Sequence, residues 1–312
     1  IDFEKRGDKW FAMSGPIEKL PDQQELDYRT MLETLKDYVK KTGFEKVLLG
    51  LSGGIDSALV AAIAVDALGS NNVRCVMLPS EFTSESSLSD ARAVAKNLHC
   101  SLNTIPISEP KTAVSKVLRD LFQDKDADVT EENIQSRLRG LLLMAMSNKF
   151  GEMLLTTGNK SEVAVGYSTI YGDMSGGYNP LKDLYKTKVF EISRWRNLNH
   201  RSWMLGSSGV IIPETILTKA PTAELRDNQK DQDSLPDYEV LDAILMAFID
   251  DEKSVAEIVK MGFDRKIVKD IEDLIYKSEY KRYQSAPGTK LSGRAFWLDR
   301  RYPIANKWRD NS

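Results

Sequence analysis

The sequence predicts an α/β protein in which a doubly wound parallel sheet carries helices on both faces, with a helical subregion toward the C-terminus. Short apolar runs alternate with longer segments of helical spacing, which is the pattern of strands joined by crossover helices. Gly53 and Gly54 stand where one such strand gives way to a helix, and sheets of this kind bind ligands at the carboxyl ends of their strands. With 312 residues, the chain can bury a substantial core.

The first half of the chain supplies the predicted sheet and its helices. Apolar residues at positions 26, 31, 32, 35 and 39 recur at helical spacing and predict a helix over 25–41. Apolar runs predict strands over 46–51, 73–78, 102–107 and 152–157. The intervening helices are expected from the glycines to residue 68 and over 89–98, 110–122 and 133–150. Each strand is thus followed by a helix long enough to cross back over the sheet.

The second half is predicted to be helical, with long connections. Helices are expected over 237–249, 254–261 and 264–282, and the segment 284–312 is basic and aromatic. Residues 79–87 fit a loop that closes over a nucleotide, and 203–236 form a second long loop of a kind that is usually functional or disordered. Residues 1–21 show neither a helical nor a strand period, so we expect a linker-like lead before one domain over 22–312.

Composition narrows the class of protein. A net charge of -3 and a pI near 5.7 give no support for a nucleic-acid partner. No apolar run approaches the roughly 20 residues needed to cross a bilayer, so no membrane partner is expected. Cys75 and Cys100 lack metal-ligand spacing and are expected to be buried free thiols, which favours a cytoplasmic location. We assign no chemistry to His99 or His200.

The run from Gly50 to Ser57 has the properties of a phosphate cradle. It reads Gly50, Leu51, Ser52, Gly53, Gly54, Ile55, Asp56, Ser57. Its glycines can adopt positive φ and leave no Cβ between the backbone and an anion at a helix N-terminus. Asp56 would repel phosphates unless a divalent cation joined them, so the run predicts pyrophosphate together with Mg²⁺. The alternative is a packing turn in which Asp56 complements the helix dipole.

Further polar residues follow the strand that ends at Thr157. In such a sheet Thr157 and Glu162 would stand at the same crevice as Asp56, giving two carboxylates for one Mg²⁺. Lys186 could supply a point charge to the β or γ phosphate. Glu162 could instead cap a helix, and Lys186 could be a solvated lysine before one.

The loop resembles the SGGxDS motif of the N-type ATP pyrophosphatases, which cut ATP between its α and β phosphates. Four segments together resemble NAD synthetase: 133–137, 156–173, 180–186 and 221–225. The resemblance runs from about residue 24 to the end of the chain. This family has the adenine nucleotide alpha hydrolase-like fold. The resemblance implies ATP-dependent amidation of deamido-NAD to NAD through an acyl-adenylate, with ATP as cosubstrate, ammonia as nitrogen donor and a homodimer as the default assembly.

The resemblance also implies residue roles. ATP is expected on residues 50–57, Thr157, Lys186 and Thr222, and Mg²⁺ on Asp56 and Glu162. Deamido-NAD is expected on Asn133, Arg137, Tyr167 and Lys281. Asp173 would lie near the reacting carboxylate, where it could help to deprotonate ammonia, and Lys186 would share the catalytic role. Each has an alternative: Tyr167 could be core, Arg137 could pair with Glu131 or Glu132, and Asp173 could only shape a turn.

The sequence departs from the ammonia-dependent members of the family. Those commonly carry a lysine where Ile170 stands, an aspartate near Gly177 and a histidine where Tyr280 stands. The run 280–304 instead resembles the larger glutamine-dependent enzymes, so we expect this chain to be the synthetase portion of a protein that also has a glutaminase domain. The rivals are another N-type ATP pyrophosphatase, amidating a nucleotide or modifying tRNA, and a module that senses ATP without turnover.

Overall fold

The computed structural model describes residues 1–15 and 20–312, and a four-stranded parallel sheet forms the centre of this part of the chain. Its strands lie in the order β5, β4, β3, β6. Their bounds are β3 (Val47–Gly50), β4 (Val73–Met77), β5 (Ser101–Thr104) and β6 (Met153–Leu155). Leu49 of β3 pairs with Cys75 on one side and Leu155 on the other. The four predicted strands are therefore confirmed, each within a few residues of its expected ends.

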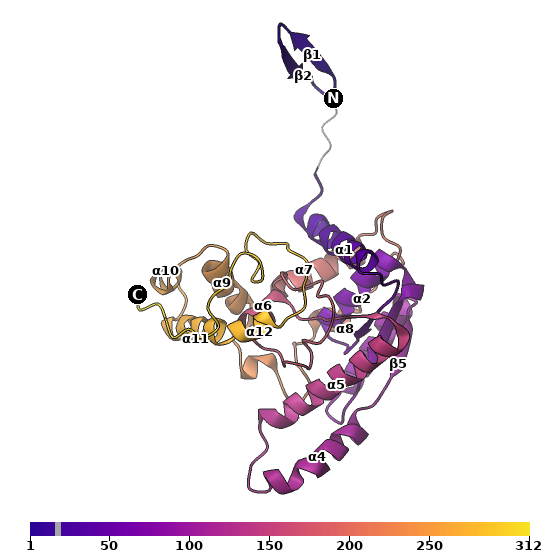
Figure 1. Ribbon diagram of the computed structural model, residues 1–312, viewed down its shortest axis with the longest axis vertical. Helices are drawn as coiled ribbons and strands as arrows, with labels where there is room; N and C mark the ends of the chain where they lie inside the picture. The colour runs from indigo at the N-terminus through magenta and orange to yellow at the C-terminus, as the bar shows by residue number, and fades with distance from the viewer. Residues whose placement is uncertain (16–19) are drawn as a thin grey trace.

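Helices cover both faces of this sheet, which confirms the doubly wound class (Figure 1). The helices of this half are α1 (Gln23–Lys41), α2 (Ile55–Leu68), α3 (Glu85–Asn97), α4 (Ser108–Phe122), α5 (Val129–Phe150) and α7 (Lys186–Leu198), with a 3₁₀ turn η1 (Ser70–Asn72). Successive residues of β3 point to opposite faces. Leu49 joins the core under α1, α2 and α7, whereas Leu48 packs with Leu143 of α5.

The C-terminal helices form a second core beside the sheet (Figure 1). Its elements are α6 (Lys160–Val165), α9 (Tyr238–Ile249), α10 (Val255–Lys260), α11 (Arg265–Lys277) and α12 (Glu279–Tyr283). The connection before α9 contains α8 (Glu214–Thr218) and a 3₁₀ turn, η2 (Asp231–Asp233). The predicted helical subregion is confirmed. The single helix expected over 264–282 is wrong, because the chain breaks at Ser278, whose hydroxyl donates to Val165 O at 2.8 Å.

Three further expectations need correction. Helices α6, α7 and α8 were not predicted from the sequence. Helix α3 begins at Glu85 rather than at 89, because the side chain of Ser84 accepts a hydrogen bond from Ser87 N and caps it. The lead contains an antiparallel hairpin, β1 (Phe3–Arg6) and β2 (Lys9–Ala12), so the absence of a strand period was a wrong prediction there. Residues 16–19 of the expected lead lie outside the described residues.

The two remaining expectations concern the burial of the cysteines and the membrane-spanning potential of the helices. Cys75 is buried and free, as predicted, whereas Cys100 is free but only half-buried. Their Sγ atoms lie 3.5 Å apart, a proximity that their separation in sequence did not indicate. Across residues 1–15 and 20–312, no helix combines the length and the apolar character that a bilayer span requires.

Candidate functional site

The glycine loop, residues 52–57, joins β3 to α2 at the carboxyl end of the sheet. Gly53 has φ +85°, and a Cβ there would lie 2.3 Å from Ser87 O, so both the conformation and the close approach require glycine. Gly54 has an ordinary φ of -89° and caps α2. The first helical bond runs from Ala58 N to Gly54 O, which leaves the preceding N–H groups at the open end of the helix.

The two serine hydroxyls of the glycine loop hold it in shape. Ser52 Oγ lies 3.1 Å from Ser57 Oγ and accepts from Gly54 N at 3.2 Å. Ser57 Oγ donates to Gly54 O at 3.0 Å and accepts from Ser52 N at 3.2 Å. The loop is thus built around its own hydroxyls before any ligand is considered, and the prediction of a strand, a glycine turn and a helix in this order is confirmed.

Two adjoining cavities open beside the glycine loop. The first is lined by the whole glycine loop, Thr157, Glu162, Lys186 and Thr222. The second is lined by Gly50, Leu51 and Ser52, and also by Thr157. Every residue expected to bind ATP therefore lines at least one of the two cavities. Thr222 reaches the first from the long connection before α9, where its hydroxyl donates to Gln229 O at 2.7 Å.

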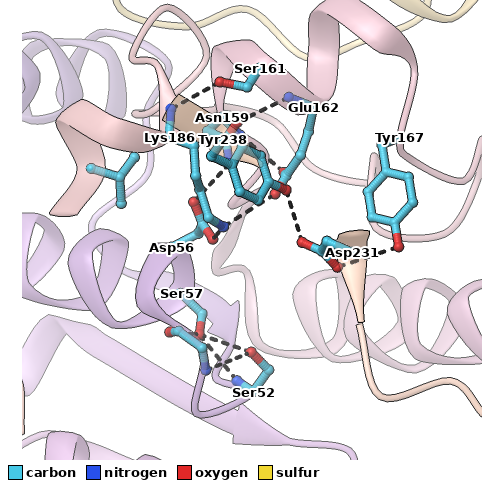
Figure 2. A network of polar contacts seen from close by, with 12 residues as sticks. Ser52, Asp56, Ser57, Asn159, Ser161, Glu162, Tyr167, Lys186, Asp231 and Tyr238 are labelled. Carbon is cyan, nitrogen blue, oxygen red and sulfur yellow. Dashed lines mark hydrogen bonds and ion pairs between the residues drawn. The ribbon is translucent and has the colours of Figure 1, made fainter. Parts of the chain in front are cut away.

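Asp56 and Glu162 converge on the ammonium group of Lys186 (Figure 2). Lys186 Nζ forms an ion pair with Asp56 Oδ2 and lies 3.5 Å from Glu162 Oε1. Asn159 Nδ2 donates to the other oxygen of Asp56 at 2.9 Å. Burial lowers the pKa of Lys186, but the two carboxylates outweigh it and raise that pKa above its usual value. Three elements, α2, α6 and α7, thus bring together residues that are 130 positions apart.

Glu162 also caps its own helix. Its Oε2 accepts from Asn159 N at 3.3 Å while Asn159 Oδ1 accepts from Glu162 N at 3.0 Å, a reciprocal capping box. The alternative considered for this residue is therefore real, and it coexists with the contact to Lys186. Burial, with the charge of Asp56 next, raises the pKa of Glu162 to about 8. One lysine does not offset the negative charge gathered here.

The two carboxylates fit a magnesium ion that takes its other ligands from outside the protein. Asp56 and Glu162 offer carboxylate oxygens facing one point, which is the ligand type that Mg²⁺ prefers. Within residues 1–15 and 20–312, no three His, Cys, Asp or Glu side chains gather closely enough to hold a metal by themselves. Mg²⁺ commonly takes one or two carboxylates, with phosphate oxygens and water as its other ligands. Two carboxylates beside a phosphate cradle are consistent with that arrangement.

A line of polar side chains leads away from this cluster toward Tyr167 (Figure 2). Asp231 Oδ2 accepts from Tyr238 OH at 2.8 Å, and its Oδ1 accepts from Tyr167 OH at 3.3 Å. The ammonium group of Lys186 lies 5.2 Å from the centroid of the Tyr238 ring. Tyr167 also packs against the second core, so the core alternative for it is partly right. Asp231, a residue not singled out from the sequence, joins the two tyrosines.

Of the four residues expected to bind deamido-NAD, three hold the segment 166–173 and the fourth, Tyr167, belongs to it. Lys281 Nζ donates at 2.7 Å to Gly166 O and Ser168 O. Asn133 Oδ1 accepts from Thr169 Oγ1 at 2.8 Å, and Arg137 Nε donates to Ile170 O at 3.2 Å. Tyr167 and Lys281 line the first cavity. Asn133 and Arg137 lie outside the lining of both cavities and reach the segment from α5.

Asp173 belongs to both cavities. Its Oδ1 accepts from Thr169 N at 2.8 Å, so it also shapes the turn, as the alternative proposed. The backbone N–H of Asp173 donates to Ser136 Oγ at 3.0 Å. Its side chain is accessible from the cavity, yet the protein atoms around it restrict hydration and raise the pKa of Asp173 to about 6.

A family model described as NAD synthase matches residues 27–285. The chain belongs to the NAD synthase family. It is 61% identical over 312 residues to a glutamine-dependent NAD(+) synthetase of Rhodobacter capsulatus, across 100% of this chain and 56% of that protein. The resemblance that the motifs predicted is confirmed, and the chain spans about half the length of the curated relatives it matches.

Solved structures of an NAD+ synthetase and an NMN synthetase share the fold. The glutamine-dependent NAD+ synthetase of Acinetobacter baumannii, in complex with adenosine diphosphate, has a TM-score of 0.62 and 43% identity over 95% of this chain and 53% of that one. The NMN synthetase of Francisella tularensis has a TM-score of 0.68 and 27% identity, over 83% of this chain and 95% of that one.

Besides Asp231, the cavities of this NAD synthase family member contain Arg139, Lys219 and Glu224, which the sequence did not indicate as site residues. Arg139 donates to Leu78 O at 3.0 Å in the second cavity, where burial lowers its pKa to about 10. Lys219 and Glu224 line the first cavity and form an ion pair at 3.2 Å. Both flank Pro221 and Thr222. The segment 221–225, which contributed to the family resemblance, could therefore have indicated them.

Proposed function

We propose that this chain catalyses the ATP-dependent amidation of deamido-NAD to NAD, with ammonia as the nitrogen donor and AMP and pyrophosphate as the other products. One observation carries the proposal. A single cavity gathers the glycine loop, the Asp56, Glu162 and Lys186 cluster, and residues of the segment 166–173. Membership of the NAD synthase family supports the same reaction.

The chemistry explains why ATP is needed. A carboxylate does not accept ammonia at neutral pH, because oxide would have to leave. The nicotinate carboxylate of deamido-NAD therefore attacks the α phosphorus of ATP, and pyrophosphate departs with the electrons of the broken P–O bond. Ammonia then attacks the acyl carbon of the adenylate, loses a proton and displaces AMP. Most of the protein's task is alignment and stabilisation of the departing negative charge.

The residues of the cavity suit those tasks. The N–H groups and hydroxyls of the glycine loop would bind the phosphates, with Thr157 and Thr222 beside them. The ammonium group of Lys186 would exchange its contacts with Asp56 and Glu162 for contacts with the departing pyrophosphate. A Mg²⁺ ion held by Asp56 and Glu162 would supply further neutralisation of phosphate charge. Asp173, which has a pKa of about 6 and is ionised at pH 7, would accept the proton that ammonia loses.

A turnover assay tests the reaction. The chain is incubated with ATP, Mg²⁺, deamido-NAD and ammonium chloride, and products are separated by chromatography. NAD and AMP should appear in equal amounts. ADP as the nucleotide product, or no NAD, would overturn the proposal. Glutamine in place of ammonium should give no NAD with this chain alone, because the glutaminase activity is assigned to a further domain.

A second candidate is amidation of a smaller nucleotide. The solved NMN synthetase is similar over 95% of its own length, which favours testing the mononucleotide with a nicotinate base. Tyr167 and Lys281, which the resemblance assigns to deamido-NAD, line the first cavity together with the glycine loop. We therefore expect a higher kcat/KM for deamido-NAD. A higher value for the mononucleotide would reverse the assignment.

We further propose a homodimer formed through α4 and α5. Figure 1 places α4 at the lower edge of the molecule, outside α5. Within these helices Val117 is 78% exposed, Leu121 76% and Leu141 64%. Such apolar exposure is typical of an interface. Light scattering should give twice the chain mass of 35.1 kDa, and Val117→Asp with Leu121→Glu should halve it. A wild-type monomer would contradict the proposal.

The cytoplasmic location stays a prediction.

A further inference from the structure

Lys219 follows α8 and extends its ammonium group into the first cavity. Its Nζ lies 2.5 Å from Ser87 Oγ and 3.2 Å from Glu224 Oε1. Ser84 Oγ and Ser86 Oγ are more distant, each at 3.5 Å. The side chain of Lys219 keeps 27% of its surface exposed. It is therefore a cavity cation held mainly by hydroxyl groups and by one carboxylate.

Ser87 connects Lys219 to the glycine loop. A Cβ on Gly53 would lie 2.3 Å from Ser87 O, which means that the first turn of α3 packs directly on the backbone of the loop. Lys219 Nζ touches the hydroxyl of that same serine. The ammonium group is consequently separated from the glycine loop by a single residue. Lys186 approaches the loop through Asp56, so the two lysines reach it through different neighbours.

The other basic side chains of the first cavity are held by carboxylates or by backbone carbonyl groups. Lys186 is paired with two carboxylates, and Lys281 is held by two backbone carbonyl groups. Arg282 donates to Ala164 O at 2.6 Å and to Glu279 Oε2 at 2.7 Å. A serine hydroxyl carries no formal charge, whereas a phosphate oxygen does, so Coulomb attraction favours the phosphate as the partner of an ammonium group. The nearest partner of Lys219 is a serine hydroxyl, which a phosphate oxygen can replace without freeing a backbone carbonyl group.

The charge of the cavity creates a need for such a cation. Its lining contains five acidic side chains, Asp56, Glu162, Asp173, Glu224 and Asp231, and four basic ones, Lys186, Lys219, Lys281 and Arg282, so it has no surplus of positive charge whether Glu162 is ionised or protonated. A triphosphate brings about four further negative charges at neutral pH. One divalent ion offsets only half of these. A lysine next to the glycine loop lowers the remaining repulsion where the pyrophosphate end of ATP would lie.

We propose that Lys219 binds the β or γ phosphate of ATP and stabilises the pyrophosphate as it leaves. This inference rests on the proposed function for the identity of the ligand. Lys219 exchanges its bond to Ser87 for one to a phosphate oxygen, while Glu224 stays in place. Glu224 accepts from Ser84 Oγ at 2.8 Å and from Ser87 Oγ at 2.7 Å, which holds the 219–224 segment on α3 without Lys219.

Binding measurements separate phosphate recognition from a structural role. The probes are an ATP analogue with a methylene group between its α and β phosphorus atoms, and AMP, each titrated by calorimetry in the presence of Mg²⁺. Lys219→Met should weaken binding of the triphosphate analogue by about 10- to 100-fold, the usual range for one hydrogen bond to a charged group. Binding of AMP should change by less than about twofold, and Lys219→Arg should recover most of the affinity for the analogue.

Two further variants serve as controls. Lys188→Met removes a lysine of α7 that pairs with Glu191 at 2.7 Å on the surface, and it should leave both affinities unchanged. Glu224→Gln removes the carboxylate that shares Lys219, so it should bind the analogue at least as tightly as the wild type. If Lys219 served only to hold Glu224, Lys219→Met and Glu224→Gln would weaken binding alike, which would overturn the proposal.

The remaining outcomes are equally decisive. Unchanged affinity of Lys219→Met for the analogue, or an equal loss for AMP, would overturn a phosphate contact. A wild-type chain that binds the analogue but forms no NAD would overturn the proposed reaction alone, since the effect of Lys219→Met on binding could still be read. A wild-type chain that does not bind the analogue would overturn both.

Discussion

The glycine loop and the segment 166–173 face the same cavity, but different forces hold them. The glycine loop lies between a buried strand and a helix, and its shape comes from its own serines and from the contact of Gly53 with α3. The segment 166–173 is held by side chains from α5 and α12 that bind its backbone carbonyl groups. We infer that the loop is shaped by the fold, whereas the segment is shaped by a few replaceable contacts.

The largest effect is expected where the glycine loop meets the carboxylate pair. Asp56→Ala removes a carboxylate that pairs with Lys186 and would bind the ion. We expect NAD formation to fall by roughly 100-fold or more, the scale on which loss of one electrostatic group affects a preorganised site. Asp37→Ala, which removes a surface carboxylate paired with Lys41, is the control and should have the wild-type rate. A wild-type rate for Asp56→Ala at ordinary Mg²⁺ would exclude Asp56 from the site.

The next effect tests whether the fold shapes the glycine loop. Gly53 and Gly43 have nearly the same φ, +85° and +83°, but a Cβ on Gly43 would meet open space. Alanine at either position should lower the free energy of unfolding by about 1–2 kcal/mol for the backbone conformation. Gly53→Ala should cost about 1–3 kcal/mol more because its Cβ collides with Ser87. Urea unfolding measures both, and equal losses would contradict the packing of the loop on α3.

The segment 166–173 should respond to loss of a side-chain contact in substrate binding. Lys281→Met removes two donors, at 2.7 Å from Gly166 O and Ser168 O. We expect the KM for deamido-NAD to rise about tenfold, the equivalent of one charge-assisted hydrogen bond, with the KM for ATP within about twofold. Lys277→Met, on the exposed side of α11, is the control. An equal rise in both KM values would mean that the segment and the glycine loop are one unit.

The smallest effect concerns pH. With its pKa raised to about 8 by burial and by Asp56, the carboxyl group of Glu162 is mostly protonated at pH 7, and Mg²⁺ binding must release that proton. Affinity for Mg²⁺ should therefore increase by about fivefold from pH 7 to pH 8 and level off above that. Calorimetry in buffers of different ionisation enthalpy would detect the released proton. Glu162→Gln should remove this pH dependence, and a flat wild-type profile would contradict the raised pKa.

The sequence predicted the glycine loop well because its structure is local. The strand, the turn and the helix follow one another in 22 residues, from Val47 to Leu68, and each has its own periodicity or turn chemistry. The same reasoning could have found α6, because Asn159 and Glu162 have capping-box spacing. It could also have found α7, in which Val189, Ile192 and Trp195 recur at intervals of three.

Other parts of the site could not be predicted in this way. Asp231 and Glu224 lie on a long connection without periodicity, and their partners are Tyr167 and Ser84, 64 and 140 positions away. Only the folded chain brings such residues together. The roles of Asn133 and Arg137 came from the family resemblance, and the structure places both against the segment 166–173 but outside the lining of the two cavities.

The double duty of Glu162 has a consequence for protein engineering. Glutamine can complete the same capping box, so Glu162→Gln preserves the start of α6 and removes a buried charge whose ionisation burial opposes. A library screened for heat resistance would accept this substitution readily. It would also lose half of the carboxylate pair, and the survivors would be well-folded proteins that have become inert. Selection at this position must therefore score turnover and melting temperature together.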